Sequence, residues 1–153
     1  MAADASAPAA ESAATVSRLL VAVSSALAAE RLSGPAADLA KRLSAEVLIV
    51  HVSRPAGGQI RQQEQAEGET AINLMRSRLA EKAIVTQTLL MFSDDIARSL
   101  VTTAEEHKCT LIVLGLTGKN IFARLLAGNV PVELIKSTRI PVMLLPPDWD
   151  GVV

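Results

Sequence analysis

The sequence predicts an α/β fold in which helices cover both faces of a parallel, five-stranded sheet. Three observations support this: the chain contains five short apolar runs, segments with helical periodicity separate them, and most of the runs are continuously apolar. Continuous runs are typical of parallel strands that are buried on both faces, and parallel strands need crossover connections between them. The chain is therefore expected to be doubly wound, with a sheet between two helical layers.

The first two strands are expected at residues 18–23 (RLLVAV) and 46–52 (EVLIVHV). The first is a short apolar run that ends at a pair of serines, and the second is rich in β-branched residues. A helix is expected between them over residues 33–44. Ser33 would be its N-cap and Pro35 would lie in its first turn, because serine and proline favour these positions.

The third and fourth strands are expected at residues 84–92 and 110–115, each after a segment with helical spacing of its apolar residues. Residues 59–82 are polar at first and amphipathic later, which predicts a helix that is frayed at its start. The SDD sequence at residues 93–95 predicts the cap of another helix, since aspartate favours the positive end of a helix dipole.

The last part of the chain is expected to contain a mostly helical segment, residues 121–137, and a fifth strand, residues 140–147. Two prolines stop this strand, because proline cannot donate a ladder hydrogen bond. We expect one domain over residues 17–147, with an alanine-rich, disordered N-terminal tail at residues 1–16 and a C-terminal tail at residues 148–153.

The composition argues against several classes of function. The 153 residues include 15 basic and 16 acidic side chains spread along the chain, so no basic surface for nucleic acid is expected. No apolar run approaches the length of a membrane span, and residues 1–16 lack the pattern of a signal peptide. The single cysteine, Cys109, fits a cytoplasmic location, and the histidines lack the spacing of metal ligands.

Three glycines, Gly115, Gly118 and Gly128, follow the fourth expected strand. One interpretation is a phosphate-binding loop, because glycine permits close approach and backbone N–H groups near a helix start bind anions. The other interpretation is ordinary turn and helix-capping chemistry. The sequence departs from the P-loop pattern, which needs a glycine where Val113 stands, and it lacks the GxGxxG dinucleotide fingerprint.

Over about residues 17–147 the chain resembles the universal stress protein family. The resemblance lies in the runs LLVAV, VLIVHV, LIVLG and IPVMLL, and in the spacing Gly115-x2-Gly118-x9-Gly128, which is similar to the signature of the family's ATP-binding branch. It implies an open, Rossmann-like sheet of the adenine nucleotide alpha hydrolase type, with strand order 3-2-1-4-5. It also implies a homodimer joined through the last strand, from Ile140 to Leu145.

The resemblance also assigns candidate roles to the strand ends. Ala22 and Ser24 stand in a motif whose last residue is aspartate in ATP-binding relatives, so Ser24 replaces a carboxylate. Val52 would read adenine through its backbone, and Leu114 would line the same pocket.

After the third glycine, the family carries serine or threonine where this chain has Asn129, followed by Val130 and Pro131. The proline has neither a backbone nor a side-chain donor for phosphate. The nucleotide-binding candidates are therefore Ala22, Ser24, Val52, Leu114, Gly115, Gly118, Gly128, Asn129 and Val130.

The function implied by the resemblance is that of a dimeric, non-catalytic sensor or adaptor with an unidentified protein partner. Its cofactor would be an adenine nucleotide, ATP, ADP or AMP, with Mg²⁺ as a further candidate. No general base is evident beside the glycine loop, so no catalytic residues are expected, although family analogy leaves weak ATPase activity open. Because Ser24, Asn129 and Pro131 alter the motif, the alternative is a nucleotide-free interaction module that regulates a partner such as a transporter or kinase.

Overall fold

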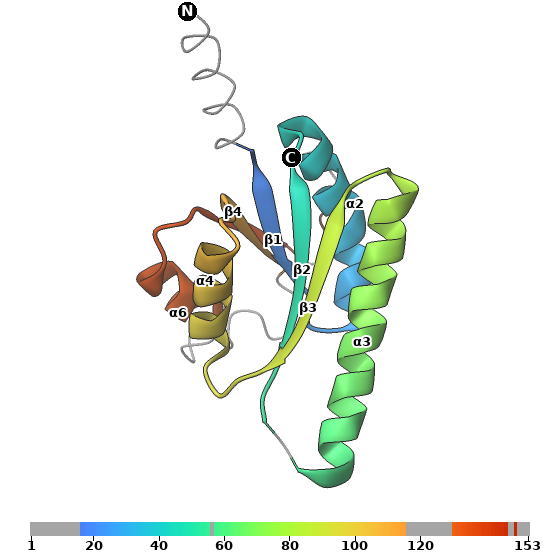
Figure 1. Ribbon diagram of the computed structural model, residues 1–153, viewed down its shortest axis with the longest axis vertical. Coiled ribbons are helices and arrows are strands. Elements are labelled where there is room, and N and C mark those ends of the chain that lie inside the picture. Colours follow the sequence, from blue (N-terminus) through green and yellow to red (C-terminus); the bar gives the residue numbers. More distant parts are fainter. Residues whose placement is uncertain (1–15, 56, 116–129, 147–148, 150–153) are drawn as a thin grey trace, which may run out of the picture.

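The five expected strands form a single parallel sheet in the computed structural model, in the order β3-β2-β1-β4-β5 (Figure 1). The structure describes residues 16–55, 57–115, 130–146 and 149. The strands are β1 (Arg18–Ala22), β2 (Glu46–Ser53), β3 (Thr86–Phe92), β4 (Leu111–Gly115) and β5 (Val142–Leu145). The helices are α2 (Ala26–Leu43), α3 (Gly58–Glu81), α4 (Ile96–Glu106) and α6 (Val130–Ser137). The predicted fold class and strand order are confirmed.

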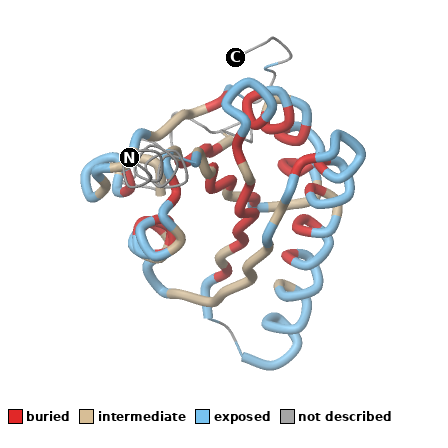
Figure 2. Tube along the Cα trace, turned by 45° about the horizontal axis from the view of Figure 1, so that its top comes forward, coloured by how far each residue is buried: buried red, intermediate tan, exposed pale blue. Residues whose placement is uncertain are grey.

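Helices cover both faces of the sheet, with α2 and α3 on one side and α4 and α6 on the other (Figure 1). Side chains alternate between the two faces along each strand, which divides the interior into two clusters. Val21 and Ile49 belong to the cluster under α2 and α3, whereas Leu20 and Leu48 belong to the cluster under α4 and α6. The central strands are accordingly buried along their length, while α3 turns one side to solvent (Figure 2).

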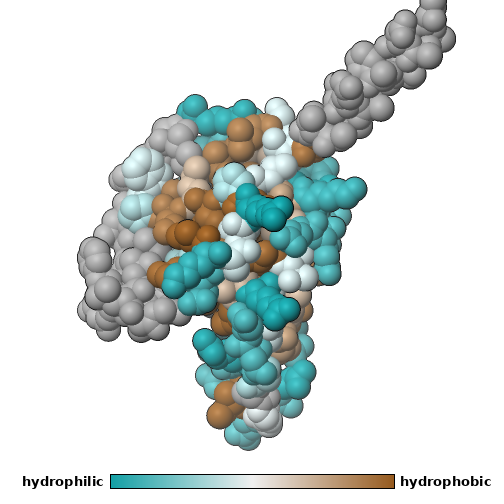
Figure 3. Space-filling model, turned by 90° about the vertical axis from the view of Figure 1, so that its left-hand side faces the viewer, coloured by the Kyte–Doolittle hydropathy of each residue, from teal (hydrophilic) through white to brown (hydrophobic). Residues whose placement is uncertain are grey.

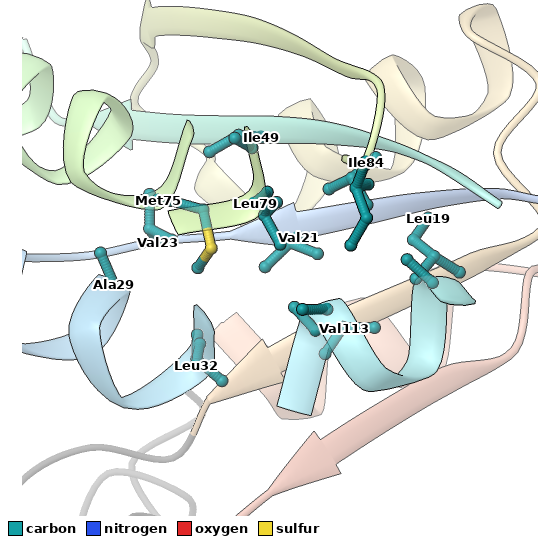
Figure 4. Packing of buried hydrophobic residues seen from close by; sticks show 14 of the residues in the cluster. Leu19, Val21, Val23, Ala29, Leu32, Ile49, Met75, Leu79, Ile84 and Val113 are labelled. Carbon is teal, nitrogen blue, oxygen red and sulfur yellow. The ribbon is translucent and has the colours of Figure 1, made fainter. Parts of the chain in front are cut away.

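The cluster under α2 and α3 shows how tightly these layers are joined. Met75 and Leu79 of α3 and Leu32 of α2 pack against Val21 and Val113 at the centre of the sheet (Figure 4). Met75 and Leu79 are fully buried, and burying such a side chain stabilises a fold by about 1.5–3 kcal/mol. This cluster holds α3 against the sheet.

At the amino ends of the strands, Arg18 joins three neighbouring segments. Its guanidinium donates to the carbonyl of His107 at 2.7 Å and to a carboxylate oxygen of Glu46 at 3.0 Å. Thr110 completes the junction, because its backbone N–H donates to the Arg18 carbonyl at 2.7 Å. These contacts fix the register of β1 between β2 and β4.

The expected start of the first helix was wrong. Helix α2 begins at Ala26, where Ser25 is the N-cap and its side chain accepts from the N–H of Ala28. Ser33 lies inside the helix and donates its hydroxyl to the carbonyl of Glu30 at 2.9 Å, so it is a satisfied buried residue and caps nothing. Pro35 is also internal, where its missing N–H removes one helical bond without ending the helix.

Other boundaries differ by a few residues, and some expectations lie outside the described residues. Helix α3 is regular from Gly58, so the expected frayed start was wrong for the residues that the structure describes. Strand β3 begins two residues later than predicted, and β5 is limited to four residues. Most of both expected tails and the first part of the segment 121–137 lie outside the description.

Candidate functional site

The sheet reverses its strand order between β1 and β4, and this defines the place where a ligand can bind. The first two crossovers run from β1 to β2 and on to β3, whereas the chain then returns to β4 on the other side of β1. In open α/β sheets, ligands bind outside the carboxyl ends of the strands at such a reversal. Ala22, the last residue of β1, pairs with Val50 of β2 and Leu114 of β4 at this edge.

Four of the candidate residues lie in one layer at this edge. Ala22, Val52, Leu114 and Val130 belong to, or pack against, the cluster between the sheet and helices α4 and α6. Leu114 is buried, while the other three are partly buried. The structure therefore brings together candidates from β1, β2, β4 and the start of α6.

Ser24 lies just beyond β1 and is exposed. It directly precedes Ser25, the N-cap of α2, so its position at the end of the first strand is as predicted. An exposed side chain at this point can reach a ligand in the crevice without first losing packing contacts. The roles of Gly118, Gly128 and Asn129 stay predictions, because these residues lie outside the described part of the chain.

The backbone N–H and carbonyl of Val52 point toward the β1 side of β2. The N–H of Glu46 donates to Ser17 on the β1 side, whereas the N–H of Val47 donates to Val85 on the β3 side. Backbone groups of alternate residues point to the same neighbouring strand. By this alternation, Val52 points toward β1, which has already ended at Ala22.

Gly115 lies in close contact with a side chain of α2. A Cβ added to this residue would lie 2.9 Å from Cδ2 and 3.0 Å from Cδ1 of Leu32, a buried residue of α2. The sequence suggested a sharp turn or close approach of backbone or ligand here, and the group that approaches is the Leu32 side chain. This contact explains the glycine without a ligand, and it leaves the backbone of Gly115 at the end of β4.

His51 was not predicted to have a role beyond its match to the family's second strand, and the structure places it at the site. Its ring is buried, with Nδ1 2.7 Å from the carbonyl oxygen of Val23 and Nε2 2.8 Å from Oγ of Ser53. The carbonyl can only accept, so Nδ1 carries a proton and donates to it. The sequence held one signal of this packing, because a glycine inside a helical pattern, here Gly68, often marks a place where another group approaches the helix closely. In the structure the group that approaches Gly68 is the His51 ring.

Metal binding and thiol chemistry find no support among the residues that the structure describes. Within residues 16–55, 57–115, 130–146 and 149, no three His, Cys, Asp or Glu side chains group closely enough to hold a metal ion. Burial raises the pKa of the Cys109 thiol to about 11, although Arg18 opposes this effect. The thiol is therefore protonated at neutral pH and is a poor nucleophile.

An open parallel sheet of strand order 3-2-1-4-5 with helices on both faces is the fold of universal stress proteins, and comparisons with known proteins agree. The model of the universal stress protein family matches residues 15–146, and the chain belongs to this family. A universal stress protein of Methanocaldococcus jannaschii is 31% identical over 120 residues, which cover 72% of this chain and 70% of the relative.

Solved structures of the family share the fold. A universal stress protein in complex with cAMP has a TM-score of 0.66 at 18% identity, over 84% of this chain and 96% of that chain. The universal stress protein from Archaeoglobus fulgidus in complex with dAMP has a TM-score of 0.64 at 21% identity, with the same coverage of the two chains. At these identities, the likeness supports the fold alone.

Proposed function

We propose that this protein binds an adenine nucleotide at the carboxyl ends of β1, β2 and β4. The observation that carries the proposal is that Ala22, Val52 and Leu114 lie at the carboxyl ends of three adjacent strands, beside the point where the strand order reverses, and belong to or pack against one cluster. The complexes of family members with cAMP and dAMP support adenine as the base.

The chemistry of the strand ends suits a purine. Ala22, which is partly buried and pairs with the buried Leu114, would offer apolar surface to the flat face of the base, and the backbone of Val52 would offer a donor and an acceptor to its edge. Gly115 would begin the phosphate loop, and the further loop residues of the proposal are Gly118, Gly128, Asn129 and Val130. Because Ser24 replaces a carboxylate, we expect weaker contacts to the ribose than in the ATP-binding branch.

We propose a non-catalytic role for the bound nucleotide, which would act as a signal read by a protein partner. The nucleotide would be AMP, ADP or ATP, the last with Mg²⁺. A cytoplasmic location is part of this proposal. None of the helices in the described part of the chain is long and apolar enough to cross a membrane.

We propose that the protein is a homodimer joined through residues 140–145, which include β5. Strand β5 lies at the edge of the sheet, and such an edge presents backbone groups that can pair with a second chain. Hydrophobic residues gather on the side of the molecule that carries α4 and α6 (Figure 3), and Ile135 of α6 is 54% exposed. Sedimentation of wild type and an Ile135→Asp variant tests this part, with a monomeric wild type as the contrary result.

A nucleotide-free interaction module is the second candidate. The exposed serine at position 24 favours it, because the carboxylate that would hold the ribose is absent. Pro131 favours it as well, since its ring nitrogen has no hydrogen to donate to phosphate.

The two candidates are separated by measuring nucleotide directly. Protein purified without added ligand is denatured and its supernatant is analysed by anion-exchange chromatography, and the native protein is titrated with AMP, cAMP and ATP by calorimetry. Saturable binding of one nucleotide per chain supports the first candidate. The absence of both released nucleotide and binding heat at millimolar ligand would favour the interaction module.

A Ser24→Asp variant sharpens this test. Hydrogen bonds to a charged group contribute about 1.5–3 kcal/mol, so a carboxylate that accepts from the ribose should tighten AMP binding about tenfold or more. Ser77→Asp is the matched control, because Ser77 is exposed in the last part of α3, which leads to the amino end of β3 and not to a carboxyl end. Equal effects of the two substitutions would mean that Ser24 does not face the ligand.

A further inference from the structure

The β1–β2 ladder stops one hydrogen bond earlier than its geometry allows. The N–H of Val23 donates to the carbonyl of Val50 at 2.9 Å. In a parallel ladder the next bond would run from the N–H of Val52 to the carbonyl of Val23. Among the described residues, the backbone hydrogen bonds do not include this one, and the Val23 carbonyl instead lies 2.7 Å from Nδ1 of His51.

We infer that His51 is a positioning residue for the adenine edge of the ligand. Its ring bonds to the Val23 carbonyl, which is the acceptor that the N–H of Val52 would use in a regular ladder. Among the described residues, neither the N–H nor the carbonyl of Val52 has a backbone partner. A donor beside an acceptor on one side of a strand matches adenine, whose ring nitrogen N1 accepts and whose 6-amino group donates. This inference rests on the proposed nucleotide function, and it assigns to His51 the task of keeping the Val52 edge open.

The ring is held in place from two other directions. Oγ of Ser53, which is itself buried, lies 2.8 Å from Nε2 and makes a hydrogen bond with it. On the α3 side, a Cβ added to Gly68 would lie 2.5 Å from Cδ2 of His51, so the helix backbone approaches the ring directly. The ring therefore has a hydrogen-bond partner at each nitrogen and the α3 backbone beside Cδ2.

Two substitutions separate the bonds made by the two ring nitrogens. The amide nitrogen of asparagine is as many bonds from Cα as Nδ1 of histidine, so His51→Asn retains a donor for the Val23 carbonyl. The amide of glutamine corresponds in the same way to Nε2, so His51→Gln retains the contact with Ser53 and frees Val23. Each variant replaces the ring with an amide and loses one of the two hydrogen bonds, so a general loss of packing should affect both variants to a similar extent.

The first readout is hydrogen exchange at the Val52 amide, measured without nucleotide. In wild type and His51→Asn this amide should exchange freely. In His51→Gln the ladder can close onto Val23, and exchange at Val52 should slow by about tenfold, as expected when an amide gains one hydrogen bond of about 1.4 kcal/mol. A purely structural role predicts the opposite direction, because destabilised proteins exchange faster.

The second readout is AMP affinity by calorimetry, with the melting temperature of each variant as the control for folding. His51→Asn should stay within about threefold of wild type and His51→Gln should lose about tenfold or more. Equal affinities of the two variants, or a Val52 amide that is as protected in wild type as in His51→Gln, would overturn the inference. If wild type binds no nucleotide, the proposed function fails, and the exchange experiment still decides whether His51 closes off the ladder.

Discussion

Replacing Gly68 with alanine tests the close contact between α3 and His51, because local and tertiary effects predict opposite signs. Alanine is favoured over glycine inside a helix by about 0.5–1 kcal/mol. On that ground alone, Gly68→Ala in the middle of α3 should stabilise the protein. The structure predicts destabilisation instead, since the new methyl group would lie 2.5 Å from Cδ2 and 2.9 Å from Nε2 of His51.

The expected size of this destabilisation follows from the contacts of the His51 ring, which the new methyl group would displace. The His51 ring cannot yield without lengthening its bonds to Val23 and Ser53, which are 2.7 and 2.8 Å long. Overpacking of a well-packed interior costs about 1–3 kcal/mol, and the helix propensity returns less than 1 kcal/mol of this. The expected net loss is about 1–2 kcal/mol, which lowers Tm by about 2–8 °C in a protein of this length.

Urea denaturation of wild type, Gly68→Ala and the exposed control Glu67→Ala measures this change. The control should stay within about 0.5 kcal/mol of wild type. In a His51→Ala background the ring is gone, so the added cost of Gly68→Ala should fall by about 1 kcal/mol. A Gly68→Ala variant that is as stable as wild type or more stable would refute the packing argument.

Three further predictions concern the rest of the sheet. Gly115→Ala should lower the free energy of unfolding by about 1 kcal/mol, because the added Cβ would lie 2.9 Å from Leu32. In a Leu32→Ala background the loss should be smaller, and additive effects of the two substitutions on the denaturation midpoint would contradict this. Arg18→Met should lower the free energy of unfolding by about 1–2 kcal/mol. Glu46→Gln should lower it less, because Arg18 in that variant keeps its bond to the His107 carbonyl, and equal losses for the two variants in chemical denaturation would contradict this. Since the pKa of Cys109 is raised to about 11 from 9.0, the folded state holds its proton longer than the unfolded state, so stability falls as pH rises from about 9 to 11. Wild type should therefore lose about 1–2 kcal/mol more than Cys109→Ala between pH 8 and 10.5, whereas parallel pH profiles of the two proteins would argue against this burial effect.

The elements that depend on local pattern could be predicted from the sequence. Each strand is a short apolar run, and the register places Ala22 beside Val50 and Leu114, as expected for adjacent parallel strands. The start of α2 could not be predicted well, because Ser33 and Pro35 are typical of a helix start. Inside α2 the hydroxyl of Ser33 finds the Glu30 carbonyl, so the same residue is compatible with a longer helix.

The role of His51 depends on residues that are distant in the chain. Its partner Val23 lies 28 positions earlier, and Gly68 is on the following helix. A histidine within an apolar run indicates burial, but its hydrogen-bond partners are set by the crossover that brings β2 beside β1. Periodicity within one segment carries no information about that pairing, which is why the sequence alone predicted the strand and not the contact.

The most direct test of the central claim is an amide NMR titration of the isotope-labelled protein with AMP. The proposed site predicts saturable chemical shift changes, at one nucleotide per chain, for the amides of Ala22, Val52, Leu114 and Gly115 at the carboxyl ends of the strands. The chemical shifts of amides near Arg18, at the amino ends of the strands, should stay unchanged. No shift at millimolar AMP, or shifts confined to the amino ends of the strands, would contradict the proposed function.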